Sequence, residues 1–260
     1  MQPTPTQSKP LLTLNSLADI SRHMSIALGA EYGYKNGYFF SESFPELDWH
    51  NRVILNEVCD NYQPLIDEAI DLSAHIGHPK FLTFCDELVP AEVPSYLESK
   101  NMSLLRTLTG MLYYPTEKDA FFHDDRIIEI TEDRIDEWDT VVHTAFGRTD
   151  DYQTGRSLLK DEEIRFFAIE EDGIASTIMV CLDGNKENAG IHNVGTLPAY
   201  RGKGYAESLV RHVIALAYKE GFPMLSLQAS DLGKPVYERI GFRKESTIRM
   251  YHSIALSKQQ

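Results

Sequence analysis

The hydrophobic pattern is most regular from residue 126 onward. There, runs with the two-residue period of a strand alternate with runs whose apolar side chains recur every three or four residues, as in a helix. Strands are predicted at 126–131, 164–170, 174–182, 191–197, 224–228 and 247–254, and helices at 132–146, 153–160, 204–220 and 235–240. Gly147, Gly221 and Gly241 stand where three of these helices should stop. This order predicts a mixed α/β or α+β sheet flanked by helices.

The first half of the chain is less regular. Helices are predicted at 15–30, 64–77 and 93–99, and strands at 81–85 and 104–113. Residues 31–50 have no clear period, and 53–58 fits either a strand or the start of a helix. A polar stretch at 116–125 is a natural boundary. We therefore expect a loose tail at 1–10, an N-terminal domain at 11–120 and a second domain at 126–260.

Two distant segments share one arrangement. Residues 81–108 and 224–250 each predict an apolar strand, a polar turn, Pro-x-Tyr on a short helix and a further strand. The matched pairs are Pro94 with Pro235 and Tyr96 with Tyr237. Either the chain contains a degenerate internal repeat, or the two segments share only a common strand–helix–strand pattern.

Charge and composition limit the partners. Asp and Glu number 39 and Lys and Arg 25, so the formal net charge is −14, which disfavours broad nucleic-acid binding. No apolar run is long enough to span a bilayer, and the polar N-terminus lacks the apolar core of a signal peptide. We expect a cytoplasmic monomer or homodimer that binds neither nucleic acid nor membranes.

The three cysteines, Cys59, Cys85 and Cys181, are scattered along the chain. This spacing predicts neither a disulfide framework nor a zinc site, so no metal is expected. They are interpreted as buried thiols in a reducing compartment.

The segment 194–206, with the sequence VGTLPAYRGKGYA, is the most informative. A predicted strand runs into a turn with two glycines, and a long helix starts at once. Backbone N–H groups at a helix start are unsatisfied and form an anion site, which the helix dipole strengthens. Gly202 and Gly204 let a phosphate approach the backbone closely, while Arg201 and Lys203 supply positive charge. The segment therefore predicts a pyrophosphate site.

Neither common nucleotide motif fits this loop. A dinucleotide fingerprint needs a glycine where Glu207 stands, and a P-loop needs Ser or Thr directly after Lys203. Instead, Arg201-x-x-Gly204-x-Ala206 resembles the Q/R-x-x-G-x-G/A signature of the GCN5-related N-acetyltransferases (GNAT). The stretch 237–242, YERIGF, is similar to the Tyr-x-x-x-Gly-Phe segment of that family. The resemblance covers about residues 126–256.

The resemblance implies the GNAT acyl-CoA N-acyltransferase fold, whose sheet splays where strand 191–197 parts from strand 224–228. Acetyl-CoA, as cosubstrate, would lie in that gap. Its diphosphate would meet the amides of 201–206, its pantetheine arm the backbone of 194–196, and its thioester carbonyl an N–H near Asn193 or Val194. Expected contacts are Asn193, Val194, Gly195, Thr196, Arg201, Gly202, Lys203, Gly204, Tyr205, Ala206, Ser230 and Tyr237.

The same resemblance assigns catalytic roles. Tyr237 occupies the position of the family's usual general acid, which would protonate the departing thiolate. The resemblance does not assign the general base; among this chain's own residues, His192 on the central strand is a candidate, with Glu170 and Asp231 as further candidates. Ser230 stands where the family often has an asparagine that contacts the cofactor, and its hydroxyl retains the ability to hydrogen-bond.

The implied function is transfer of an acetyl group from acetyl-CoA to a primary amine by direct attack. The alternatives are a non-catalytic acyl-CoA sensor, a transferase of a longer acyl group, and a nucleotide-binding protein that uses the same loop. The N-terminal half has no glycine-rich loop, so no second cofactor is expected there. That half is either a degenerate GNAT-like copy, a lid or dimer surface, or a part that shapes the acceptor pocket with Trp49, Tyr96 or Tyr113.

Overall fold

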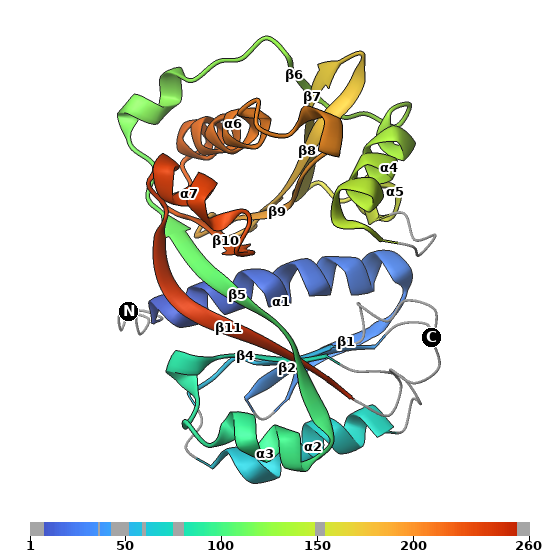
Figure 1. The fold of residues 1–260 in the computed structure, drawn as a ribbon, viewed down its shortest axis with the longest axis vertical. Coiled ribbons are helices and arrows are strands. Elements are labelled where there is room, and N and C mark those ends of the chain that lie inside the picture. Colours follow the sequence, from blue (N-terminus) through green and yellow to red (C-terminus); the bar gives the residue numbers. More distant parts are fainter. Residues whose placement is uncertain are drawn as a thin grey trace. The chain divides into compact units, whose positions relative to one another are not determined.

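The protein is described here by a computed structural model that places residues 8–35, 37–42, 52–58, 61–74, 81–148 and 154–253. The chain divides into two compact units (Figure 1). Unit 1 comprises Met1–Gly110 and Lys244–Gln260, and unit 2 comprises Met111–Arg243. This division differs from the single break expected at 120–126, because the last strand belongs to unit 1.

Unit 2 confirms the predicted order of strands and helices. Its elements are β6 (Ile127–Glu129), α4 (Ile135–Phe146), α5 (Thr154–Leu158), β7 (Ile164–Glu171), β8 (Gly173–Leu182), β9 (Ala189–Thr196), α6 (Tyr205–Glu220), β10 (Leu225–Ala229) and α7 (Lys234–Ile240), with short 3₁₀ turns at Glu117–Phe121 and Pro198–Tyr200. Gly147, Gly221 and Gly241 all follow helices with positive φ, as their stop signals predicted.

The sheet of unit 2 has the strand order β10-β9-β8-β7-β6. Strands β6 to β9 pair antiparallel, and β10 pairs parallel with β9. The two long helices, α4 and α6, cover opposite faces of this sheet (Figure 1). Neighbouring residues of β7 show this directly, because Phe166 packs against Trp138 of α4 and Phe167 against His212 of α6.

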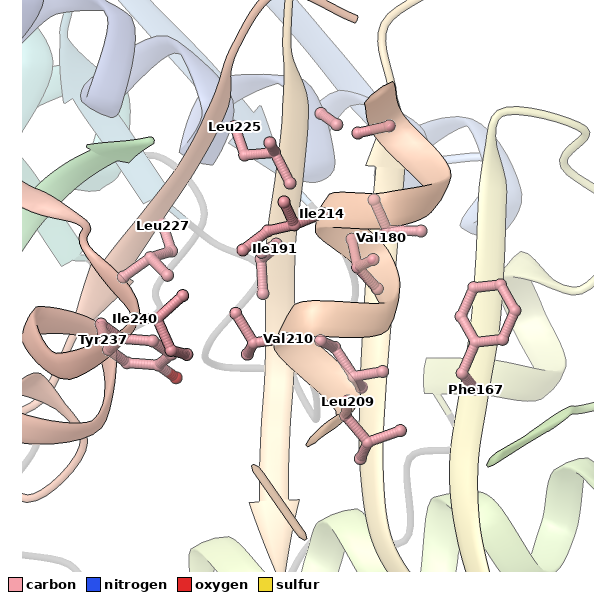
Figure 2. Packing of buried hydrophobic residues seen from close by; sticks show 14 of the residues in the cluster. Phe167, Val180, Ile191, Leu209, Val210, Ile214, Leu225, Leu227, Tyr237 and Ile240 are labelled. Atoms are coloured by element: carbon pink, nitrogen blue, oxygen red, sulfur yellow. The ribbon is translucent and has the colours of Figure 1, made fainter. Parts of the chain in front are cut away.

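An apolar core of unit 2 lies between the sheet and α6. Leu209, Val210 and Ile214 from α6 are buried against β8, β9 and β10, and Tyr237 and Ile240 from α7 join the same cluster (Figure 2). Both helices that flank the predicted cofactor site are therefore anchored by burial, the main driving force for such packing.

Unit 1 contains β1 (Glu31–Lys35), β2 (Tyr38–Glu42), β3 (Arg52–Leu55), β4 (Phe81–Cys85) and β5 (Met102–Tyr113, whose last three residues belong to unit 2). It also contains β11 (Arg243–Ser253, whose first residue belongs to unit 2), which pairs with β4. Its helices are α1 (Lys9–Leu28), α2 (Tyr62–Ala74) and α3 (Val93–Ser99). The ambiguous residues 53–58 begin as a strand, and the unassigned stretch 31–50 contains β1 and β2. Helix α1 starts inside the tail that was expected to be loose.

The two predicted strand–helix–strand segments have closely matching lengths. β4, α3 and β5 contain 5, 7 and 12 residues, and β10, α7 and β11 contain 5, 7 and 11. Pro94 and Pro235 are each second in their helix, and Tyr96 and Tyr237 each fourth. The shared arrangement is confirmed, while descent of the two segments from one repeat stays a prediction.

Cys85 and Cys181 are buried, as expected, and neither is in a disulfide, while Cys59 lies outside the described residues. Burial raises the pKa of Cys85 to about 12, so this thiol stays protonated. Within the placed ranges, no cluster of His, Cys, Asp or Glu is suited to a metal ion. No helix in that part of the chain is both long and apolar enough to cross a bilayer.

A buried polar contact fixes the packing of β5 in unit 1. The hydroxyls of Thr13 and Ser246 hydrogen-bond at 2.6 Å, and both residues are fully buried. A Cβ at Gly110 would lie 2.0 Å from the Ser246 Oγ and 2.5 Å from the Thr13 Oγ1. Only glycine leaves room for this hydroxyl pair.

We predict that Gly110→Ala lowers the free energy of unfolding by about 1–3 kcal/mol, because the new methyl overpacks a closed site. Urea denaturation measures this change. Gly184→Ala is the control, since its Cβ would meet only the mobile end of the Glu163 side chain at 2.6 Å. An equal loss in both variants would show that the fit around Gly110 is not tight.

Candidate acyl-CoA site

Strand β9 contains a bulge at Asn193. Register with β8 shifts between Thr177 and Met179, so β9 has one extra residue there, and Asn193 has a φ of 50°. Asparagine tolerates this left-handed conformation better than most residues. On the β8 side, the Thr177 hydroxyl donates to the Asn193 carbonyl at 3.3 Å, and the Ser176 hydroxyl donates to the Gly195 carbonyl at 2.9 Å. Side chains of β8 thus hold the bulged strand.

The sheet opens just beyond this point. Paired residues of β9 and β10 are Ala189 with Leu225, Gly190 with Ser226 and Ile191 with Leu227. β9 continues to Thr196, but β10 does not pair with it beyond Ile191. Backbone groups on this edge of His192–Thr196 therefore have no strand partner from β10, as the predicted splay requires.

The glycine loop follows directly and leads into α6. Gly202 and Gly204 have φ values of 78° and 82°, and no heavy atom lies within 4 Å of a Cβ built on either. Gly204 is the N-cap of α6, without a side-chain cap. Residues 201–204 of the loop are exposed, while Tyr205 at the start of α6 is buried and Ala206 is half-buried. Backbone N–H groups in the first turn of a helix have no partner within the helix, so this exposed loop and helix start have the features of an anion site. Binding of an acyl-CoA diphosphate here stays a prediction.

The two basic side chains of the loop lie in different directions. The Arg201 guanidinium donates to the carbonyls of Thr196 and Ala145. Lys203 extends over the ring of Tyr200, with its Nζ 4.8 Å from the ring centre. Tyr205 is buried, and its hydroxyl donates to the Glu171 carboxylate. Of these two loop cations, Arg201 is hydrogen-bonded to backbone carbonyls, whereas Lys203 lies over aromatic rings.

Tyr237 lies on the other side of the opening, on α7. Tyr237 is only 8% exposed, and its ring packs against that of Phe242, with 5.9 Å between the ring centres. Burial raises the pKa of this phenol well above its ordinary value. Among the residues placed by the structure, none hydrogen-bonds its hydroxyl. Figure 2 shows the ring beside Ile240, within the cluster that joins α7 to α6. The phenol is therefore protonated, and its hydroxyl is not hydrogen-bonded to any described residue.

The other predicted catalytic residues have varied surroundings. His192 is half-buried on β9, opposite Met179 of β8. Glu170 is ion-paired with Arg134 at 2.8 Å, so its carboxylate is already engaged. Asp231 is exposed in the turn before α7.

Ser230 has a structural task that sequence reasoning did not predict. Its hydroxyl accepts the Gly233 N–H at 3.2 Å, and its carbonyl accepts the Lys234 N–H at 2.9 Å. It thereby shapes the turn that starts α7. Its predicted contact with the cofactor stays a prediction.

The tyrosines proposed for the acceptor pocket have their hydroxyls engaged. Tyr96 donates to Asp67 at 2.9 Å, and Tyr113 donates to Asp119 at 3.0 Å. Trp49 lies outside the described residues.

Sequence reasoning also missed the contact between β9 and the end of α4. A Cβ at Gly195 would lie 2.9 Å from the Ala145 Cβ and 3.2 Å from the Phe146 ring. Gly195 was predicted only as a backbone contact of the cofactor. Its lack of a side chain instead lets α4 approach the strand closely. A glycine inside a predicted strand is the signal that could have found this contact.

Comparison with known proteins agrees with the family resemblance predicted from the sequence motifs. Residues 127–242 match the family model described as Acetyltransferase (GNAT) family. Among solved structures, a GCN5-related N-acetyltransferase from Kribbella flavida aligns over 93% of this chain and 97% of its own, with a TM-score of 0.68 and 15% identity. One from Sphaerobacter thermophilus aligns over 94% and 93%, with a TM-score of 0.58 and 14% identity.

A more distant fold similarity is to N-myristoyltransferase of Saccharomyces cerevisiae with bound myristoyl-CoA. It aligns over 78% of this chain and 59% of its own, with a TM-score of 0.52 and 12% identity. No curated protein matches the chain. At these identities the structural neighbours establish the fold.

A mixed sheet that opens beside a bulged strand, with a glycine loop at a helix start, defines unit 2 as an acyltransferase-type α/β domain. Together with the family match, this assigns residues 127–242 to the GNAT family, whose members use acyl-CoA. The resemblance inferred from the sequence motifs is confirmed.

Glycine at position 204 should matter for the ligand and not only for the fold. We predict that Gly204→Ala weakens CoA binding at least tenfold, because a methyl group would stand over the loop amides and the left-handed backbone would be strained by about 1–2 kcal/mol. Isothermal titration with CoA measures the change.

Gly221→Ala is the matched control for this experiment. Gly221 caps the other end of α6 with a φ of 84° and also has open space around it. Both variants should lose similar stability, while only Gly204→Ala should lose CoA affinity. Equal CoA affinity in the two variants would contradict the proposed role of the loop.

Proposed function

We propose that unit 2 transfers an acetyl group from acetyl-CoA to a primary amine. The observation that carries this proposal is the end of β9–β10 pairing at Ile191, directly before the bulge and the open glycine loop. A gap lined by backbone groups suits a pantetheine arm, which pairs with a strand edge through its own amides. Residues 194–196 supply that edge.

The bulge at Asn193 supports a role in polarising the thioester. At a bulge the regular ladder is interrupted, so an N–H from Asn193 or Val194 can be aimed at a carbonyl oxygen in the gap. Such a donor would stabilise the negative charge that develops when the amine attacks. The amine must be neutral to attack, and His192 on the same strand is our candidate for accepting its proton.

Tyr237 is proposed as the proton donor to the departing thiolate. A phenol held protonated by burial can donate a hydrogen bond throughout the neutral range. The balance is simple: the amine nitrogen forms a bond to the acetyl carbon, the carbon–sulfur bond breaks, one proton leaves the amine and one reaches the sulfur. Attack is direct, with no acyl-enzyme.

The net charge of −14 favours a cationic acceptor, such as a polyamine, an aminoglycoside or a lysine side chain. The first test is therefore release of free CoA thiol from acetyl-CoA, measured with a panel of amines, amino acids and peptides. We expect thiol release that depends on at least one amine. Binding of CoA without thiol release from any panel member would favour a non-catalytic sensor. Butyryl- and myristoyl-CoA in the same assay decide the acyl length.

Tyr237→Phe should lower kcat by about 10²–10⁴, the usual contribution of a general acid, and leave the Kd for CoA within about twofold. Tyr96→Phe is the matched control, because Tyr96 holds the same place in α3 of unit 1 and its hydroxyl is bound by Asp67. It should leave kcat unchanged. Full activity in Tyr237→Phe would remove this residue from the mechanism.

The raised pKa of Tyr237 also fixes the sign of a pH effect. A general acid works only while protonated, and a pKa above its ordinary value near 10 extends that state to higher pH. We therefore expect no loss of kcat between about pH 7.5 and 9.5 that is due to this phenol. A basic limb in that range that vanishes in Tyr237→Phe would show that the phenol ionises too early.

A further inference from the structure

We infer that Arg201 is a positioning residue, which ties the glycine loop to the end of α4 instead of holding the phosphates. Its Nε donates to the Thr196 carbonyl at 3.2 Å, and its Nη2 donates to the Ala145 carbonyl at 3.3 Å. One guanidinium therefore bridges the last residue of β9 and the last turn of α4. The effect expected on CoA binding rests on the proposed function, whereas the contacts of Arg201 with Thr196 and Ala145 do not.

This contact supplies a hydrogen-bond partner at the C-terminal end of α4. The last four carbonyls of a helix have no partner within the helix. Here the Arg148 N–H reaches the His143 carbonyl at 2.9 Å, and the Gly147 N–H reaches the Thr144 carbonyl at 3.4 Å. The next carbonyl, Ala145, accepts from Arg201. A positive charge at a helix C-terminus is also favoured by the helix dipole.

The end of α4 is the part of that helix that lies against β9 beside the bulge. Ala145 and Phe146 leave no room for a side chain at Gly195, two residues after Asn193. Because Arg201 binds the Ala145 carbonyl, it also fixes the end of α4 (Ala145 and Phe146) against β9, the strand proposed to bind the thioester. Phe146 is 52% exposed, so the end of α4 presents an aromatic ring to a ligand bound beside β9.

Lys203 provides the contrast within the same loop. Its Nζ lies 4.8 Å from the centre of the Tyr200 ring and 6.0 Å from that of Tyr205. Across the placed part of the chain, no carboxylate forms an ion pair with it. Its charge remains available to a phosphate, so the two cations of the loop have separate tasks.

The test compares Arg201→Lys, Arg201→Met, Arg201→Gln and Lys203→Met. Lysine keeps the charge but loses the planar fork that spans two carbonyls, whereas glutamine loses the charge and keeps a planar N–H donor. Hydrogen exchange of the peptide 135–148 is measured first, without ligand. We expect faster exchange in Arg201→Met and Arg201→Lys, less change in Arg201→Gln, and wild-type exchange in Lys203→Met.

The second readout is the Kd for CoA at increasing NaCl concentration. Salt screens a contact between charges, so removing a phosphate-binding cation reduces the salt dependence of Kd. We expect Lys203→Met to have a reduced salt dependence. The Arg201 variants should keep the wild-type dependence, with Arg201→Met and Arg201→Lys weakened to a similar extent, by about tenfold or less.

Rescue by Arg201→Lys together with a reduced salt dependence in Arg201→Met would overturn the inference, since both indicate a phosphate contact. Unchanged exchange of 135–148 in Arg201→Met would overturn it as well. If wild-type protein binds no CoA, the proposed function fails, while the exchange experiment still decides whether Arg201 holds α4.

Discussion

One extra residue in β9 is the constraint on which the site depends. The bulge at Asn193 interrupts the ladder with β8, and pairing with β10 ends just before it, at Ile191. A strand that paired fully on both sides would have no backbone groups left for a ligand. Because α6 starts a few residues later, the unpaired edge and the helix start lie in one continuous segment. Burial of α6 and α7 in the same core keeps both sides of the opening in place.

The two strand–helix–strand segments show how similar local structure can serve different ends. In α3, the Tyr96 hydroxyl donates to Asp67, which also pairs with Lys100 at 2.7 Å, and Lys100 lies over the Tyr96 ring. In α7, Tyr237 holds the same place in the helix, and its hydroxyl has no such partner among the described residues. The first arrangement fixes the phenol as part of the structure, and the second leaves it available for chemistry. This contrast supports a chemical role for Tyr237 and a structural role for Tyr96.

Much of unit 2 could be predicted from the sequence because its signals are local. Glycines at 147, 221 and 241 end helices through their backbone freedom, and the loop motif needs only residues 201–206. Other features depend on distant parts of the chain. Pairing of β11 with β4 joins residues more than 150 positions apart, so periodicity alone could not place the last strand in unit 1. The direction of the Arg201 side chain follows from where α4 ends, and charge alone had assigned it to the phosphates. Asn193 did carry a signal, since asparagine is among the few residues that readily adopt a positive φ.

The most direct test of the central claim is a crystal structure of the protein with CoA. The diphosphate should lie about 2.7–3.2 Å from the backbone nitrogens of residues 202–206, the range of N–H···O hydrogen bonds. The pantetheine arm should run along 194–196, between β9 and β10. A ligand bound elsewhere, or a loop with nothing beside Gly202 and Gly204 at saturating CoA, would contradict the assignment.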